Sequence, residues 1–120
     1  MSDKEEGPSQ RQLRVGETIK RAVSEILTTK IYEPFLDQTS VIVSEVRMTP
    51  DLKLASIYIF FLFNEKVDKD SFMRNMNDIA HKVKFFLAKK IKLRYMPEIR
   101  FVLDSSFEEA SKINKILNKK

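Results

Sequence analysis

The residues of this chain whose chemistry stands out are lysines and arginines gathered in one short stretch. Residues 82–100 hold seven Lys or Arg and a single acid, Glu98, which gives a formal charge of +6. The remaining 15 basic and 16 acidic residues give −1, so the net charge of +5 comes from this stretch. A concentrated cationic patch is the electrostatic footprint of a nucleic-acid-binding module. The side chains that we expect to meet phosphates are Lys82, Lys84, Lys89, Lys90, Lys92 and Arg94, with a weaker cluster that includes Arg11 and Arg14.

These cations have competing interpretations. No acid interrupts the run from Lys82 to Arg94, whereas a solvated helix face usually mixes both signs. The weaker N-terminal cluster is interrupted by Glu17, so a solvated face explains it as well as RNA binding does. Lys90 falls near the apolar side of its predicted helix. Its aliphatic chain can lie along apolar surface while the ammonium group reaches water, which is an alternative to RNA binding. Phe85 stands among the lysines, where packing on a neighbour is favoured over stacking on a base.

Catalytic or metal-binding chemistry finds little support in the sequence. His81 is the only histidine, and Asp78, three residues before it, has the spacing of a helix-surface contact. Cysteine is absent, which excludes disulfides and thiolate metal sites. There is no phosphate-cradling glycine loop, nucleophile elbow or metal-ligand cluster in the sequence. We therefore expect neither an enzyme nor a metal or cofactor.

The length and composition predict one domain with a short tail. A chain of 120 residues can form one ordinary core. Residues 1–8 are polar, lack periodicity and end in Gly-Pro, so we expect a disordered tail and then a single domain over residues 9–120. No apolar run approaches the roughly 20 residues of a membrane span, and the polar start is unlike a signal peptide.

A helix and a hairpin are predicted ahead of the basic stretch. Ser9 can cap a helix that runs to about Ile31, and Gly16 inside it marks either a close packing contact or a tolerated surface glycine. Residues 40–48 and 54–63 are rich in β-branched and aromatic types and flank turn residues, which predicts an antiparallel hairpin with a central second strand. The apolar stripe of the helix is Leu13, Ile19, Val23, Ile26 and Leu27.

The basic stretch itself is predicted to be helical and fixed to the sheet by its apolar side. A helix capped by Ser71 bends near residues 79–81 and continues as the cationic helix until residues 95–97, where Pro97 stops it. A third strand follows over residues 99–103, and Ser106 to Glu109 form a capping box that opens a short last helix. The apolar residues of the two central helices are Phe72, Met76, Ile79, Val83, Phe86, Leu87 and Ile91.

Several of these stretches, taken in order, are shared with a known family. They are Arg14-Val15, residues 43–46 leading to Asp51-Leu52, residues 55–59, Leu93-Arg94 with residues 97–101, and Asp104 with Ser106, Ile113 and Leu117. With this set, which spans about residues 11–117, the chain resembles the bacterial ribosome-binding factor A family.

The resemblance implies an α+β fold, that of a type II KH-like domain. Its order is α–β–β–α–(kink)–α–β, with a three-stranded sheet covered by helices on one face, plus the short C-terminal helix. Where the family carries Ala-x-Gly at the kink, this chain has Ile79, Ala80 and His81. Because His replaces the glycine, we expect a bend rather than a left-handed turn.

The resemblance also implies a function. It suggests a cytoplasmic factor that binds the 16S ribosomal RNA of the small (30S) ribosomal subunit and assists its late maturation, including at low temperature. We expect a monomer that uses no cofactor, no membrane and no small-molecule substrate.

Three other functions stay open at the level of sequence. A membrane-surface module would lay the basic helix on anionic lipid, which requires a free apolar face. A protein-interaction domain would bind acidic partners. A generic KH-like module would bind isolated single-stranded RNA without needing the assembled subunit.

Overall fold

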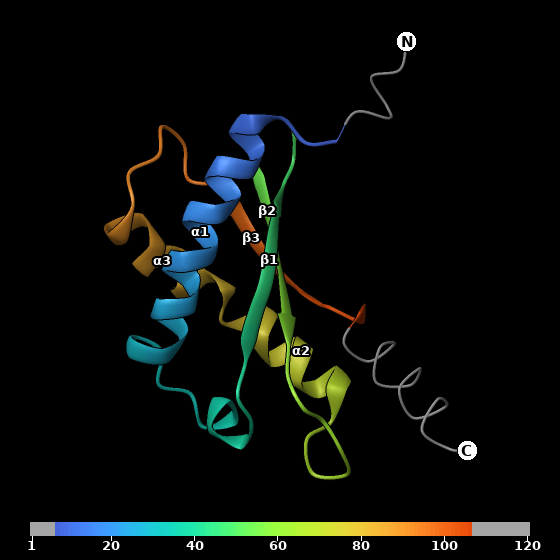
Figure 1. Cartoon of the computed structure of the whole chain (residues 1–120). Coiled ribbons are helices and arrows are strands. Elements are labelled where there is room, and N and C mark those ends of the chain that lie inside the picture. Colours follow the sequence, from blue (N-terminus) through green and yellow to red (C-terminus); the bar gives the residue numbers. More distant parts are fainter. Residues whose placement is uncertain (1–6, 107–120) are drawn as a thin grey trace, which may run out of the picture.

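The fold is that of a computed structural model, in which residues 7–106 are described. Three α-helices and a three-stranded sheet form two layers within this range, which confirms the predicted α+β class (Figure 1). The elements in order are α1 (Gln10–Thr29), the 3₁₀ helix η2 (Pro34–Gln38), β1 (Ile42–Met48), β2 (Leu54–Phe60), α2 (Lys69–Asp78), α3 (Ala80–Lys90) and β3 (Glu98–Leu103).

The sheet has the order β1-β2-β3, so β2 is central as its apolar sequence predicts. β1 pairs with β2 antiparallel, and β3 pairs with β2 in parallel. In this register Val46, Ile57 and Phe101 lie side by side on the inner face. A parallel neighbour requires a long crossover, and α2 with α3 supplies it.

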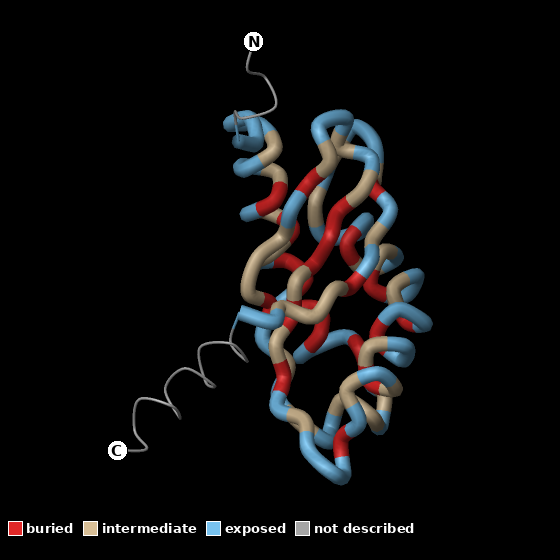
Figure 2. The backbone as a smooth tube through the Cα atoms, turned by 90° about the vertical axis from the view of Figure 1, so that its right-hand side faces the viewer, coloured by how far each residue is buried: buried red, intermediate tan, exposed pale blue. Residues whose placement is uncertain are grey.

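The core lies between the inner face of the sheet and the helices, where Figure 2 shows the buried stretches along the middle of the molecule. Ala55, Ile57 and Ile59 of β2 are fully buried. The fully buried helical side chains that meet this layer include Ile19 and Val23 of α1 and Val83 and Leu87 of α3. Burial of one side of each helix fixes its rotation, and therefore fixes where its polar side chains point.

The N-terminal helix begins as predicted, but one residue of its stripe is misplaced. Ser9 caps α1 in a full capping box, because its hydroxyl accepts from the Gln12 N–H at 3.1 Å and the Gln12 side chain accepts from the Ser9 N–H. Leu13 is 49% exposed, so the prediction that it belongs to the buried stripe is wrong. The Gln12 side chain, which donates to the Met48 carbonyl at 2.9 Å, occupies the side of α1 that meets β1.

Two further element boundaries differ from the sequence prediction. β2 ends at Phe60 rather than Phe63, because Phe61 leaves the sheet and stacks on Phe72 of α2 with ring centroids 4.1 Å apart. α2 begins at Lys69 and is capped by Asp68 rather than Ser71. The Ser71 N–H donates to the Asp68 carboxylate at 2.9 Å, and a carboxylate suits the positive end of a helix.

The end of the basic helix also differs from the prediction, and β1 and β3 begin at Ile42 and Glu98 rather than at residues 40 and 99. α3 ends at Lys90, and Ile91 is already extended (φ −127°, ψ 156°), so the prediction that Pro97 stops this helix is wrong. The loop of residues 91–97 instead packs Ile91, Leu93 and Met96 against the core before β3 begins. Residues 1–6 of the predicted tail (residues 1–8) and the predicted last helix beyond Ser106 lie outside the described residues.

Gly16 marks a close contact between α1 and β1. A Cβ atom at this position would lie 2.8 Å from the carbonyl oxygen of Val46, a distance that real Cβ atoms essentially never show. The neighbouring atom belongs to the backbone of a paired strand, so it cannot rotate away. Of the two interpretations of this glycine, the structure confirms the packing contact.

We predict that Gly16→Ala destabilises the fold. Glycine to alanine inside a helix ordinarily stabilises it by about 1 kcal/mol. Here the added carbon collides with the Val46 carbonyl, and overpacking of this kind costs roughly 1–3 kcal/mol. Urea denaturation measures the change. Gly7→Ala is the matched control, because a Cβ there meets nothing within 4 Å; a Gly16→Ala protein as stable as that control would refute the contact.

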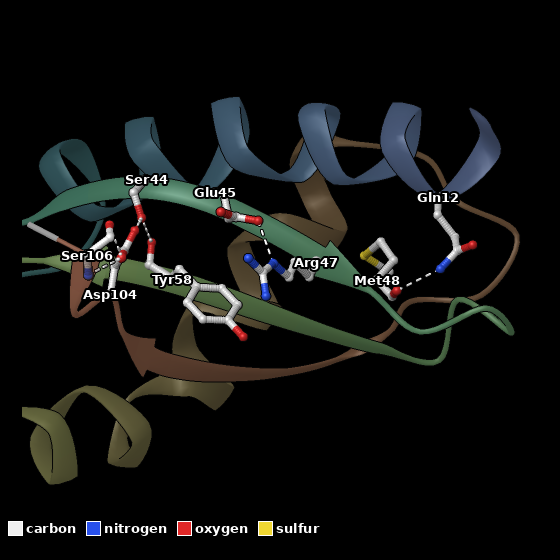
Figure 3. A network of polar contacts seen from close by, with 8 residues as sticks. All are labelled: Gln12, Ser44, Glu45, Arg47, Met48, Tyr58, Asp104 and Ser106. Carbon is white, nitrogen blue, oxygen red and sulfur yellow. Dashed lines mark hydrogen bonds and ion pairs between the residues drawn. The ribbon is translucent and has the colours of Figure 1, made fainter. Parts of the chain in front are cut away.

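A polar network ties the end of β3 to an irregularity in β1. The β1–β2 register shifts between Val43 and Glu45, and the Ser44 hydroxyl at this bulge donates to the Asp104 carboxylate at 2.5 Å (Figure 3). The Ser106 hydroxyl and N–H donate to the same carboxylate at 2.6 and 3.0 Å. The hydrogen bonds from Ser106 and then Ser44 hold the pKa of Asp104 below its ordinary value, so the folded state favours the ionised carboxylate.

We predict that Asp104→Asn destabilises the protein in a pH-dependent manner. Because folding lowers this pKa, the carboxylate stabilises the fold at neutral pH, and that contribution is lost as the pH falls below about 4 and through the folded-state pKa. The stability difference from the wild type in urea should therefore shrink between pH 7 and pH 3. Asp37→Asn, at an exposed carboxylate of η2, is the control. A difference that stays constant over this range would show that the ionised form is not what matters.

Candidate nucleic-acid interface

The six cations of the basic stretch do not share one helix face. Lys82, Lys84, Lys89 and Lys90 lie on α3, while Lys92 and Arg94 lie in the loop of residues 91–97. Val83 and Leu87 are fully buried, so the apolar side of α3 is fixed to the core as predicted, and the lysines leave the helix along its flanks. The prediction that one continuous helix carries all six is wrong.

Three of the four helical lysines are paired with carboxylates of this chain. Lys82 Nζ lies 2.5 Å from Glu33 after α1, Lys84 Nζ lies 2.7 Å from Glu98 at the start of β3, and Lys90 Nζ lies 2.9 Å from Glu25 of α1. The three pairs point to three different places on the protein, and each has an exposed or half-exposed member. Pairs of this kind contribute about 0–1 kcal/mol, so they reduce the local charge more than they lock the structure.

The remaining cations of the stretch form no ion pair with residues 7–106. Lys89 Nζ lies over the ring of Phe85, 4.4 Å from its centroid, and Phe85 contacts Phe86 edge-on while staying 55% exposed. Arg94 lies 5.6 Å from the ring centroid of Tyr95. Lys92 is exposed in the loop. These side chains keep their charge available for an external anion.

Two more cations come to the same end of the molecule from other elements. Arg11 of α1 and Lys53 of the β1–β2 turn line a hollow together with Arg94 of the loop. The Glu98 N–H donates to the Lys53 carbonyl at 2.8 Å, which holds the turn before β2 beside the loop before β3 (Figure 1). We call Lys92 and Arg94 of the loop, Arg11, Lys53 and Lys89 the loop-end basic surface, in which Lys89 lies at the α3 end of the loop and lines a groove against the C-terminal half of α1 rather than the hollow.

The sequence prediction covers four members of this surface and misses Lys53. Lys53 can be assigned to this surface only once β2 and β3 are known to be parallel. Parallel strands begin at the same edge of the sheet, which brings the residue before β2 close to the loop before β3. Arg14 is exposed on α1 but does not line the hollow. A second, smaller groove between α1 and α3 is lined by Lys30, Lys89 and Lys90 over Ile26 and Phe86.

One carboxylate, that of Asp51 in the β1–β2 turn, also lines the hollow. Asp51 accepts from the Thr49 hydroxyl at 2.7 Å and from the Lys53 N–H at 3.1 Å. The Thr49 hydroxyl and then the Lys53 N–H hold the pKa of Asp51 below its ordinary value. The turn also forces Leu52 to a positive φ of 60°, which is uncommon for a large side chain. Asp51 is therefore occupied in shaping the turn, and three cations outnumber it around the hollow.

The kink between α2 and α3 is a one-residue bend. Ile79 (φ −96°, ψ 7°) separates the helices, Ala80 begins α3, and none of residues 79–81 has a positive φ. This confirms the expected bend without a glycine turn. The His81 ring contacts the backbone carbonyl of Asp78 at 3.0 Å rather than its carboxylate. No sequence pattern pointed to Asn77, whose side-chain oxygen accepts from the Phe101 N–H at 2.8 Å and whose side-chain N–H donates to the Phe101 carbonyl at 3.1 Å, which joins the kink to β3.

Residues 7–106 contain neither a metal-binding cluster nor a membrane-spanning helix. Across residues 7–106, no group of three or more His, Asp or Glu side chains is arranged to hold a metal ion. None of the helices in that range has the length and apolar character needed to cross a bilayer. The cationic surface therefore remains the candidate site.

Comparisons with known proteins agree on one family. The family model of Ribosome-binding factor A matches residues 11–117. A protein of that name from Roseobacter denitrificans is 40% identical over 94% of this chain and 78% of its own length, and one from Bradyrhizobium sp. is 42% identical over 92% and 80%.

Solved structures with the same name share the fold. The crystal structure of ribosome-binding factor A from Thermus thermophilus superposes with a TM-score of 0.65 at 21% identity, over 77% of this chain and 94% of that one. A Thermotoga maritima solution structure described as a putative ribosome binding factor A has a TM-score of 0.61 at 24% identity, over 80% and 89%. A homology model of the Thermus protein, fitted into a cryo-electron microscopy map of a 30S–RbfA complex, has a TM-score of 0.60 at 19% identity, over 75% and 91%.

We predict that the Lys84–Glu98 pair contributes little stability. Glu98→Gln removes the charge from a side chain that is 75% exposed, and the free energy of unfolding should change by less than about 1 kcal/mol. Asn77→Ala is the contrasting variant, since it leaves both Phe101 backbone groups without their partner and should cost about 1–3 kcal/mol. Urea denaturation of both variants tests this. If both variants lost the same free energy of unfolding, the Lys84–Glu98 pair would be needed to hold β3 in place.

Proposed function

This chain belongs to the ribosome-binding factor A family, and from that membership and its cationic surface we propose that it binds the 16S ribosomal RNA of the small subunit and assists maturation of that subunit. The cytoplasm, where small subunits are assembled, is the proposed place of action. No catalytic step and no cofactor enters the proposal. The fitted 30S–RbfA complex of the Thermus relative supports the choice of partner.

The observation that carries the proposal is the loop-end basic surface. Its five cations come from α1, the β1–β2 turn, α3 and the loop before β3, and none of them is paired with a carboxylate among residues 7–106. Neutralising RNA phosphates with such side chains releases counterions, which is the main source of affinity in nucleic-acid binding. The contact surface therefore differs from the single basic helix that the sequence suggests.

Selectivity in this proposal comes from shape. Lysine and arginine read phosphate charge rather than base identity, so the spacing of the cations must match one arrangement of folded RNA. The buried sides of α1 and α3 and the hydrogen bond between Glu98 and Lys53 hold that spacing. Binding would favour the matching RNA conformation and shift its population during assembly.

Burial within the fold weighs against the membrane alternative. A helix that binds a lipid surface must offer its apolar side. In α3, Val83 and Leu87 are fully buried and Phe86 is half-buried against the core, so Phe85, which is 55% exposed, is the one large apolar side chain that this helix leaves open. An acidic protein partner would meet the same cations, and nuclease treatment of a pull-down separates that alternative from RNA binding.

We predict that charge reversal at the loop end strongly weakens binding to small subunits. The variant Lys89→Glu with Lys92→Glu replaces two available cations by acids, which should lower affinity by at least tenfold at physiological salt. The slope of log K against log salt should become shallower by about 2, or about 1 for each phosphate contact. Sucrose-gradient co-sedimentation with purified small subunits measures both effects.

The matched control is Lys66→Glu with Lys69→Glu. These two substitutions change the net charge by the same amount. They lie in the loop before α2 and in the first turn of α2, at the opposite end of the molecule from the loop of residues 91–97 (Figure 1). The control should bind as the wild type does. Equal loss of binding by both variants would show that only net charge matters. Unchanged binding by both would show that the loop-end basic surface is not the docking site.

The wild type should also travel with free small subunits and not with complete ribosomes.

A further inference from the structure

The hollow at the loop end has a feature that phosphate binding alone does not explain. Its volume is about 710 Å³, which falls in the range of roughly 300–1,000 Å³ typical of clefts for small ligands. Part of its lining is apolar, with Val15 from α1, Leu52 from the turn and Leu93 from the loop. Phosphate groups are strongly hydrated and gain nothing from an apolar wall, so this lining suits another part of the ligand.

Cations and an aromatic ring surround this apolar lining. Arg11, Lys53 and Arg94 approach it from three different elements. Tyr95 also lines the hollow, yet it is 74% exposed, and Arg94 lies 5.6 Å from the centroid of its ring. A large ring left open beside a guanidinium group offers a face on which a flat aromatic ligand can stack.

A ligand that satisfies both features has a flat, weakly polar ring joined to a negative backbone. We propose that the hollow binds a single unpaired nucleotide of RNA, with its base against Tyr95 and the apolar lining and its flanking phosphates on Arg11, Lys53 and Arg94. Recognition of splayed-out bases by aromatic side chains is common in RNA binding and tolerates any base, because every base has a stacking face. The inference rests on the proposed function and names which part of the RNA this surface meets.

The test compares two RNA hairpins that share the same stem and terminal loop, one with a fully paired stem and one with a single additional bulged adenosine in the stem. The terminal loop is the same in both and the bulge adds only one phosphate, so a several-fold difference in affinity reports the bulged nucleotide. Wild-type protein should bind the bulged hairpin about fivefold more tightly or better, as expected for one base–aromatic stack. Fluorescence anisotropy with labelled hairpins measures the two affinities.

Variants assign the preference to the hollow. Tyr95→Ala should abolish the preference for the bulge, while Tyr95→Phe, which keeps the ring, should retain it. Tyr32→Ala is the control, because Tyr32 is 85% exposed at the other end of α1. Tyr95 is also exposed, so its replacement leaves the core intact, which thermal denaturation checks.

Failure of the nucleotide site can be distinguished from failure of the proposed function. Equal binding of both hairpins by the wild type, no measurable binding of the bulged hairpin, or a preference that survives Tyr95→Ala would each overturn the nucleotide site. If the site fails in this way while Lys89→Glu with Lys92→Glu still lowers the affinity for small subunits at least tenfold, the proposed function stands. If the bulge preference is found but the wild type does not travel with small subunits, the nucleotide site stands and the proposed function fails.

Discussion

The parallel pairing of β3 with β2 determines where the charged surface of this protein forms. Because the two strands run in the same direction, the chain must cross the sheet between them, and α2 and α3 make that crossing. The same pairing places the residues just before β2 beside the residues just before β3, through the hydrogen bond from Glu98 to the Lys53 carbonyl. Cations far apart in sequence therefore meet at one end of the sheet.

Sequence patterns predicted most of the fold because local signals and tertiary packing agree there. The run of β-branched and aromatic residues in β2, the Ser9 cap and the apolar side of α3 each depend on neighbouring residues only. The errors occur where a distant contact decides. Phe61 leaves its strand to reach Phe72, and Ile91 leaves its helix to pack on the core, and neither contact has a signature in the local sequence.

The candidate site was less predictable than the fold, since charge along a sequence differs from charge in space. Glu25 and Glu33 belong to or follow the first helix, yet they neutralise Lys90 and Lys82 on the third. A count of the charges in residues 82–100 leaves out these two carboxylates. Lys53 is isolated in the sequence but lies beside Arg11 and Arg94 in the folded protein. The family resemblance was the stronger guide to function, and geometry was the stronger guide to which cations are available.

Asn77 has a consequence for association between molecules. β3 is the last strand on its side of the sheet, and such a strand offers free backbone groups on which a strand from another chain can be added. The amide of Asn77 occupies both backbone groups of Phe101 in the middle of β3. A peptide or a second copy cannot extend the sheet along this strand without first displacing that side chain. The hydrogen bonds of this one asparagine therefore oppose the addition of a strand at the middle of β3.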